Sequence, residues 1–178
     1  MHHAPLTTAV FDDLIAALGE IRDGYVNDPE RCVDPLEVAE AYRYVAQVLS
    51  AASELFVEAD PERPRFANIV TPARKLQGDN PDAIYHFARV RGDRAYRISG
   101  RIHEECYTSF TIHGKAADGG MAGPLLGDIN DRQFEVGADG KYSLVLSADE
   151  QPGNWYRLDP AAHSIVVRSY YALDTSAQ

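Results

Sequence analysis

The sequence predicts an α+β fold, in which an N-terminal helical hairpin is followed by an antiparallel, jelly-roll-like β-sandwich. Apolar residues recur at helical spacing as far as Phe56. After Arg65 the spacing changes to two, and β-branched and aromatic residues come in short runs separated by glycine-containing turns. We therefore expect residues 1–64 to form the hairpin and residues 65–178 to form the sandwich, together as one structural unit.

The first helix is predicted to begin behind the hydroxyl groups of Thr7 and Thr8, which are suited to capping a helix N-terminus. Gly24 offers a left-handed residue that would end this helix. The apolar positions between these limits are Phe11, Leu14, Ile15, Leu18 and Ile21.

A second and longer helix is predicted to begin at Pro35, because Asp34 can cap it and Glu37 lies in its first turn. The prolines within residues 60–64 end it. This helix must pack its apolar stripe against the first helix, a face of the sandwich, or the same helix of a second subunit, and the pattern leaves all three open. The stripe consists of Val38, Ala41, Tyr42, Val45, Val48, Leu49, Ala52, Leu55 and Phe56.

At least six strands are predicted in the second half of the chain. Residues 83–90 and 95–103 would form a hairpin through the turn 91–94, and residues 133–136 and 142–147 would form another. The segment 114–131 is long and glycine-rich, so we expect a loop there, either a binding loop or a plain surface connection. The other predicted strands are 106–113 and 164–172.

The net charge of -10 argues against binding to nucleic acids or to anionic membranes. The N-terminal residues lack the basic region of an export signal, and no stretch approaches the roughly 20 apolar residues of a membrane span. Cys32 and Cys106 are too few for a disulfide framework. These features predict a cytoplasmic protein with reduced thiols.

Alternation places polar side chains on one face of two consecutive predicted strands. Arginine, histidine, tyrosine and serine on such a wall could hold an anionic or hydroxylated ligand, whereas a plain solvated face explains the same pattern. The wall would comprise Arg97, Ser99, Arg101, His103, Tyr107, Ser109, Thr111 and His113.

Acidic residues precede the first predicted strand, where Asp79 and Asp82 stand beside Asn80 and Pro81. Turn formation explains this cluster, because such side chains bond to nearby amides. Alternatively, Asp79 or Asp82 faces the polar wall as a general acid or base, or pairs with one of its arginines. No metal or cofactor is predicted, because the histidines lack a metal-binding spacing and no nucleotide-binding loop occurs.

The only tryptophan, Trp155, follows a turn and stands between Asn154 and Tyr156. One interpretation is a core anchor. In the other, Trp155 forms a stacking platform for a flat or sugar-like ligand, and Asn154 and Arg157 supply hydrogen bonds. The two interpretations are compatible.

Three motifs taken together resemble the bacterial domain of unknown function twelve-fourteen family. They are Lys75 to Tyr85, Tyr96 to Gly100 and Gln151 to Trp155, and the resemblance covers about residues 65–173. The resemblance implies a β-sandwich and carries no catalytic residues to this chain.

Two functions are consistent with these features. In the first, the protein binds a small polar or anionic organic ligand through Arg97 and Arg101, with hydrolase or lyase chemistry in which His103 moves a proton and Tyr107 and Asp82 take part. In the second, it is a non-catalytic module for oligomerisation or protein interaction, and a homodimer forms through the second helix.

Overall fold

The computed structural model describes residues 8–76, 78 and 80–172 of the 178-residue chain. The chain divides into two compact units, one ending at Leu49 and the other beginning at Ser50. This division falls inside the second helix, not after the proline-rich segment. Two α-helices and eight strands in two sheets occur in the described residues and make the fold α+β. Among the described residues no helix is long and apolar enough to cross a membrane.

The first helix runs past its predicted end. α1 (Thr8–Ile21) is followed directly by η1 (Arg22–Val26), a π-helical turn. Gly24 lies inside this turn, so the prediction that it ends the helix is wrong. The end comes at Asn27, which has a negative φ of -92° and donates its N–H to the Arg22 carbonyl oxygen. Thr7, one of the two predicted caps, lies outside the described residues.

The second helix begins where the sequence predicts. In α2 (Pro35–Ala52), Asp34 Oδ1 accepts the N–H groups of Leu36 at 2.7 Å and Glu37 at 2.9 Å. Glu37 Oε2 reaches back to the N–H of Val33 at 2.7 Å. These bonds satisfy donors that have no partner within the first turn. η2 (Ser53–Val57) continues the helix, which therefore ends before the prolines.

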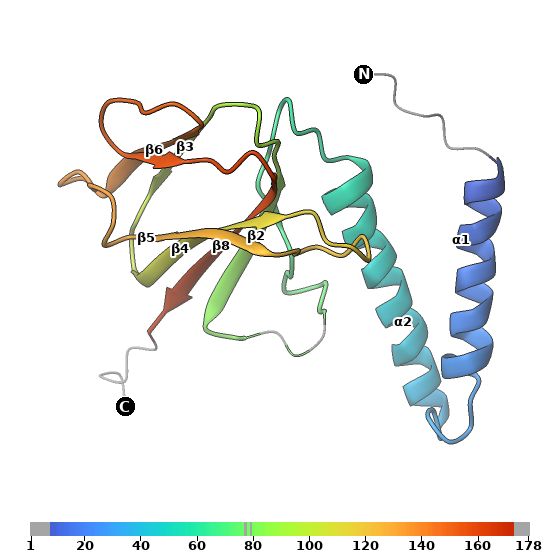
Figure 1. Cartoon of the computed structure of the whole chain (residues 1–178). Helices are drawn as coiled ribbons and strands as arrows, with labels where there is room; N and C mark the ends of the chain where they lie inside the picture. The colour runs from blue at the N-terminus through green and yellow to red at the C-terminus, as the bar shows by residue number, and fades with distance from the viewer. Residues whose placement is uncertain (1–7, 77, 79, 173–178) are drawn as a thin grey trace, which may run out of the picture. The chain divides into compact units, whose positions relative to one another are not determined.

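An apolar groove lies between α1 and the first part of α2, two segments that diverge from their connecting turn (Figure 1). It has a volume of about 530 Å³, and Ile15, Leu18, Val45 and Leu49 contribute to its lining. Ile15 remains 54% exposed and Leu49 remains 37% exposed. Tyr42, Val45 and Leu49 of the predicted stripe thus line this groove without being closed over by α1. The last part of the stripe, Leu55 and Phe56, packs in a buried cluster with Phe87 instead.

The strands form two mostly antiparallel sheets, which are separate in Figure 1. Sheet A has the order β1-β2-β8-β4-β5, and sheet B has the order β3-β6-β7. Among the described strands, only β6 and β7 pair in parallel. The strands are β1 (Ala67–Asn68), β2 (Ala83–Arg89), β3 (Tyr96–Arg101), β4 (Glu105–Gly114), β5 (Leu125–Asn130), β6 (Lys141–Ser147), β7 (Trp155–Arg157) and β8 (Ala162–Tyr171).

Neither predicted hairpin forms. The connection 91–94 carries the chain from sheet A to sheet B, because β2 pairs with β1 and β8 whereas β3 pairs with β6. Val90 and Ile98 therefore reach the same core from the two ends of this connection. Residues 133–136 are not a strand, and β6 pairs with β3 and β7 instead. The predicted loop 114–131 contains β5 near its end.

Two clusters of buried side chains lie on opposite faces of sheet A. The larger cluster draws Phe110 and Ile165 from sheet A and Leu146 from sheet B. The smaller cluster joins Leu55 of η2 to Phe87 of β2 and to Val166 of β8. Because Ile165 and Val166 are consecutive strand residues, their side chains point to opposite faces. Strand β8 thus contributes to both clusters.

Substitution of Leu146 by alanine is expected to destabilise the protein strongly, because this side chain is 0% exposed and its removal leaves a cavity. We expect a loss of about 2–5 kcal/mol in the free energy of unfolding, measured by urea denaturation. The control is Leu125→Ala, where the side chain is 61% exposed, and it should change stability by less than about 0.5 kcal/mol. Equal effects of the two variants would contradict this packing.

Candidate functional site

Tyrosine and arginine side chains gather on the face of sheet A that carries the smaller cluster. Directly opposite residues of antiparallel strands share a face. Arg168 of β8 lies opposite Tyr85 of β2 and Ser109 of β4, and Tyr170 lies opposite Tyr107. We call this surface the tyrosine–arginine face, and it comprises Tyr85, Tyr107, Ser109, Thr111, Arg168 and Tyr170.

A hydroxyl group of β4 holds the Arg168 side chain in place. Arg168 Nη1 donates a hydrogen bond to Thr111 Oγ1, and this hydroxyl donates in turn to the Val166 carbonyl oxygen at 3.0 Å. One edge of the guanidinium group is thereby tethered to the sheet. Its remaining N–H groups form no hydrogen bond with another described side chain, so they are available to a ligand.

Arg168 lacks the counter-charge that comparable arginines have. Four of the described arginines are half-buried. Among these, Arg74 Nη1 lies 2.7 Å from Glu54 Oε2, and Arg91 Nη1 lies 3.2 Å from Glu62 Oε1. Arg168 forms no ion pair within the part of the chain that the structure describes. A half-buried cation without an opposite charge is costly, and in a chain with 27 acidic residues it is unexpected.

Tyr85 lies opposite Arg168 in the sheet, and Tyr107 and Tyr170 lie on the same face. The rings of Tyr107 and Tyr170 lie 5.9 Å apart at a tilted angle. Burial raises the pKa of Tyr85, and its hydrogen bond with Tyr170 raises this pKa further, whereas the nearby charge of Arg168 lowers it. The face therefore offers one guanidinium group together with the hydroxyl groups of three tyrosines.

The predicted catalytic residues lie in different places. Tyr107 is half-buried on the tyrosine–arginine face. Asp82 precedes β2 at the same end of sheet A, where its carbonyl oxygen accepts the Tyr171 N–H at 2.8 Å. His103 is exposed between β3 and β4, and its backbone N–H donates to Glu105 Oε2 at 2.6 Å. Asp79 lies outside the described residues.

The predicted polar wall is wrong in half of its members. Arg97 and Arg101 belong to β3 in sheet B, whereas Tyr107 belongs to β4 in sheet A. These strands are not neighbours, so their polar faces do not join. Both arginines are exposed, and Arg101 Nε donates to the Asp139 carbonyl oxygen at 2.7 Å.

Asn154 uses its amide to hold the backbone together. Its Oδ1 accepts the Glu135 N–H at 2.7 Å, and its Nδ2 donates to the carbonyl oxygens of Glu135 at 2.8 Å and Ser143 at 3.2 Å. The amide thus replaces the strand pairing that was predicted for residues 133–136. Trp155 is half-buried and donates from Nε1 to Ser147 Oγ at 2.9 Å, and Arg157 is exposed.

Sequence reasoning missed Tyr85, Arg168 and Tyr170. Strand alternation does place Arg168 and Tyr170 on one face of the predicted strand 164–172. The sequence pattern does not show that this strand pairs with both β2 and β4, which are distant from it in the sequence. Such long-range pairing leaves no local signal in the residues.

Histidines do not converge on a metal site in the described residues. His86 lies opposite Val167, which belongs to the larger cluster, whereas His113 lies opposite Ser164 on the other face of sheet A. No group of three histidine, cysteine or acidic residues able to hold a metal ion occurs in the described part of the chain.

A solved structure with a high TM-score supports the fold. The chain is similar to an uncharacterized protein from Burkholderia cenocepacia, with 33% sequence identity, a TM-score of 0.77 and coverage of 94% of this chain. The chain spans 46% of the length of that protein. A protein from Vibrio parahaemolyticus has 17% identity and a TM-score of 0.38 over 98% of this chain and 43% of its own.

Neither protein-family models nor curated proteins gave a match. The resemblance to the domain of unknown function twelve-fourteen family therefore stays a prediction.

Asn154→Ala is expected to lower the free energy of unfolding by about 0.5–1.5 kcal/mol, because it removes the side-chain hydrogen bonds to the backbone of Glu135 and Ser143. Urea denaturation measures the loss, and amide hydrogen exchange should become faster at Glu135. The control is Gln151→Ala, where only one long contact of 3.5 Å is lost. Unchanged exchange at Glu135 would show that Asn154 does not hold this segment.

Proposed function

We propose that the chain binds a small hydroxylated organic anion at the tyrosine–arginine face, with Arg168 holding the anionic group. The observation that carries this proposal is a half-buried guanidinium group that no described carboxylate neutralises. A bound carboxylate would supply the missing charge and could accept two parallel N–H bonds. Thr111 restricts the guanidinium before the ligand arrives, which lowers the entropy lost on binding.

The surroundings of Arg168 favour a polar ligand over a purely apolar one. The hydroxyl groups of Tyr85, Tyr107 and Tyr170 can donate to or accept from ligand hydroxyls. The tilted rings of Tyr107 and Tyr170 also offer surfaces on which a sugar ring can lie. A sugar acid combines these features, so we use glucuronate as the probe.

Hydrolase or lyase chemistry stays a prediction. Tyr107 lies on the proposed binding face, and Asp82 lies at the same end of sheet A. His103, the predicted proton carrier, belongs to the connection that leads from sheet B to sheet A. The sandwich arrangement of the two sheets, with jelly-roll-like connections, is likewise part of the proposal, and the core built from both sheets supports it.

Replacement of Arg168 by methionine should weaken glucuronate binding by at least about tenfold, because it removes a charged hydrogen-bonding partner and keeps a long apolar stem. Isothermal titration calorimetry measures the affinity, and neutral glucose serves as the comparison ligand without a carboxylate. Arg97→Met is the matched control, since Arg97 is exposed on sheet B. A loss with Arg97→Met and none with Arg168→Met would move the site to sheet B and contradict the proposal.

A second candidate function is self-association through the helical unit, as a homodimer that uses the second helix. The apolar groove between α1 and α2 favours it. An apolar groove of this kind can receive a helix of another copy, and two helical hairpins can combine into a four-helix bundle.

Ile15→Glu should convert such a dimer into a monomer, because the substitution places a charge in the apolar groove. Light scattering after size-exclusion chromatography measures the mass across a range of concentrations. Val57→Glu is the control, since Val57 is 68% exposed and does not line the groove. A monomeric wild-type protein at all concentrations would rule out this function.

A further inference from the structure

A cavity of about 370 Å³ lies in the second unit, between η2, the segment that follows it, and β2. Its volume falls in the range of about 300–1,000 Å³ that is usual for small-molecule sites. Its lining includes Leu55, Ala59, Arg63, Arg65, Phe87 and Arg89. We call it the Arg89 cavity. It contains no residue of the tyrosine–arginine face.

Arg89 is the second half-buried arginine without a carboxylate partner in the described part of the chain. Its guanidinium carbon lies 5.9 Å from the centre of the Phe56 ring. Its Nε is buried and has no hydrogen-bond partner in the structure. Burial also lowers the pKa of Arg89, since the charged form has lost part of its hydration. The buried Nε–H group of Arg89 therefore lacks a hydrogen-bond acceptor.

The other charges around the cavity leave the guanidinium groups in excess. Arg63 and Arg65 form no ion pair with any described residue. Among the acidic residues of the lining, Glu54 is engaged by Arg74 at 2.7 Å.

A second acidic residue of the lining, Asp60, keeps its negative charge. Its Oδ1 accepts the Glu62 N–H at 2.8 Å, a bond that forms a local turn. Glu58 and Asp60 are then the two lining carboxylates that no arginine pairs with in the described residues, beside the three guanidinium groups of Arg63, Arg65 and Arg89.

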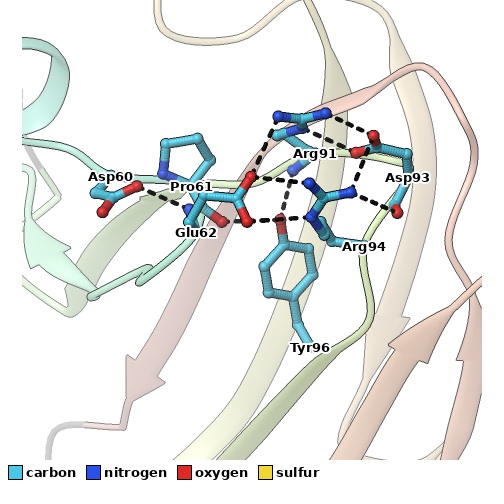
Figure 2. A network of polar contacts seen from close by, with 7 residues as sticks. All are labelled: Asp60, Pro61, Glu62, Arg91, Asp93, Arg94 and Tyr96. Carbon is cyan, nitrogen blue, oxygen red and sulfur yellow. Dashed lines mark hydrogen bonds and ion pairs between the residues drawn. The ribbon is translucent and has the colours of Figure 1, made fainter. Parts of the chain in front are cut away.

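Figure 2 shows a polar network beside the segment that lines the cavity, and Asp60 belongs to both the network and the lining. Glu62 Oε1 lies 3.2 Å from Arg91 Nη1, and Glu62 Oε2 lies 3.1 Å from Arg94 Nε. The Tyr96 hydroxyl donates to the Pro61 carbonyl oxygen at 3.0 Å and accepts the Arg91 N–H at 2.8 Å. These bonds attach the segment before Arg63 to the connection between β2 and β3. The segment that leads into Arg63 is therefore anchored without a ligand.

We propose that the Arg89 cavity is a second ligand site, which binds a small amphipathic carboxylate. Leu55 and Phe87 form an apolar floor, being 2% and 1% exposed. An apolar body can rest on this floor and gain from leaving water. The carboxylate can then accept hydrogen bonds from Arg89 and, at the rim, from the exposed Arg63 and Arg65.

Titration of the full chain with hexanoate and benzoate tests this site. Acetate has the head group alone, and hexanol has the apolar body alone, so both should bind at least about tenfold more weakly than hexanoate. Isothermal titration calorimetry gives the affinities, and amide shifts in NMR spectra locate the site. We expect shifts at Phe87 and Arg89.

Two variants with different defects make the test specific. Arg89→Met removes the charge, and Ala59→Trp fills the cavity while leaving Arg89 in place, so each should weaken hexanoate binding by at least about tenfold. Arg132→Met is the matched control, since Arg132 is exposed and does not line the cavity. Circular dichroism confirms that each variant is folded.

The outcomes distinguish this site from the one on the tyrosine–arginine face. Loss of hexanoate binding in Arg89→Met and Ala59→Trp, with full binding in Arg132→Met and Arg168→Met, supports the proposal. It is overturned if hexanoate does not bind the folded wild-type protein, if Arg89→Met binds as well as the wild type, or if Arg168→Met alone loses binding.

Discussion

Strand β8 is buried on both faces, and the rest of the second unit depends on this constraint. Its alternate side chains enter two different clusters, Ile165 the larger and Val166 the smaller. A strand in this position must have an apolar side chain on each face and a hydrogen-bonded strand on each edge, here β2 and β4. These neighbours bring Tyr85 and Tyr107 beside Arg168 and Tyr170. The candidate site is therefore a consequence of the core.

The half-buried arginines of the two proposed sites have no carboxylate partner among the described residues, whereas the other two half-buried arginines do. An exposed arginine such as Arg97 needs no partner, because water solvates it. A half-buried arginine has lost part of that hydration and needs a replacement for it. Arg74 and Arg91 obtain one from carboxylates. Arg89 and Arg168 do not obtain one within the described residues, and an anionic ligand is the replacement that we propose for both.

Local patterns predicted the elements of this fold better than their partners. The cap at Asp34 and Pro35 located the start of α2, because capping involves residues adjacent in sequence. The pairing of β3 with β6 was not predictable in this way, since the tight connection 91–94 looks the same whether it closes a hairpin or crosses between sheets. For the same reason Tyr107 was found among the candidate residues, whereas Arg168, more than fifty residues later in the chain, was not.

The surroundings of each guanidinium group determine what kind of anion it can select. Arg168 has tyrosine hydroxyls around it and a threonine that fixes its direction, so an anion must also offer polar groups to replace the water that it displaces. Arg89 lies over Phe56 and lines the same cavity as the buried side chains of Leu55 and Phe87. A polar ligand there would lose its hydrogen bonds to water and gain none from these apolar side chains. The same head group is therefore expected at both places, attached to bodies of opposite polarity. Specificity here depends less on the arginine than on its neighbours, which is why exchange of glucuronate and hexanoate between the sites should be unfavourable.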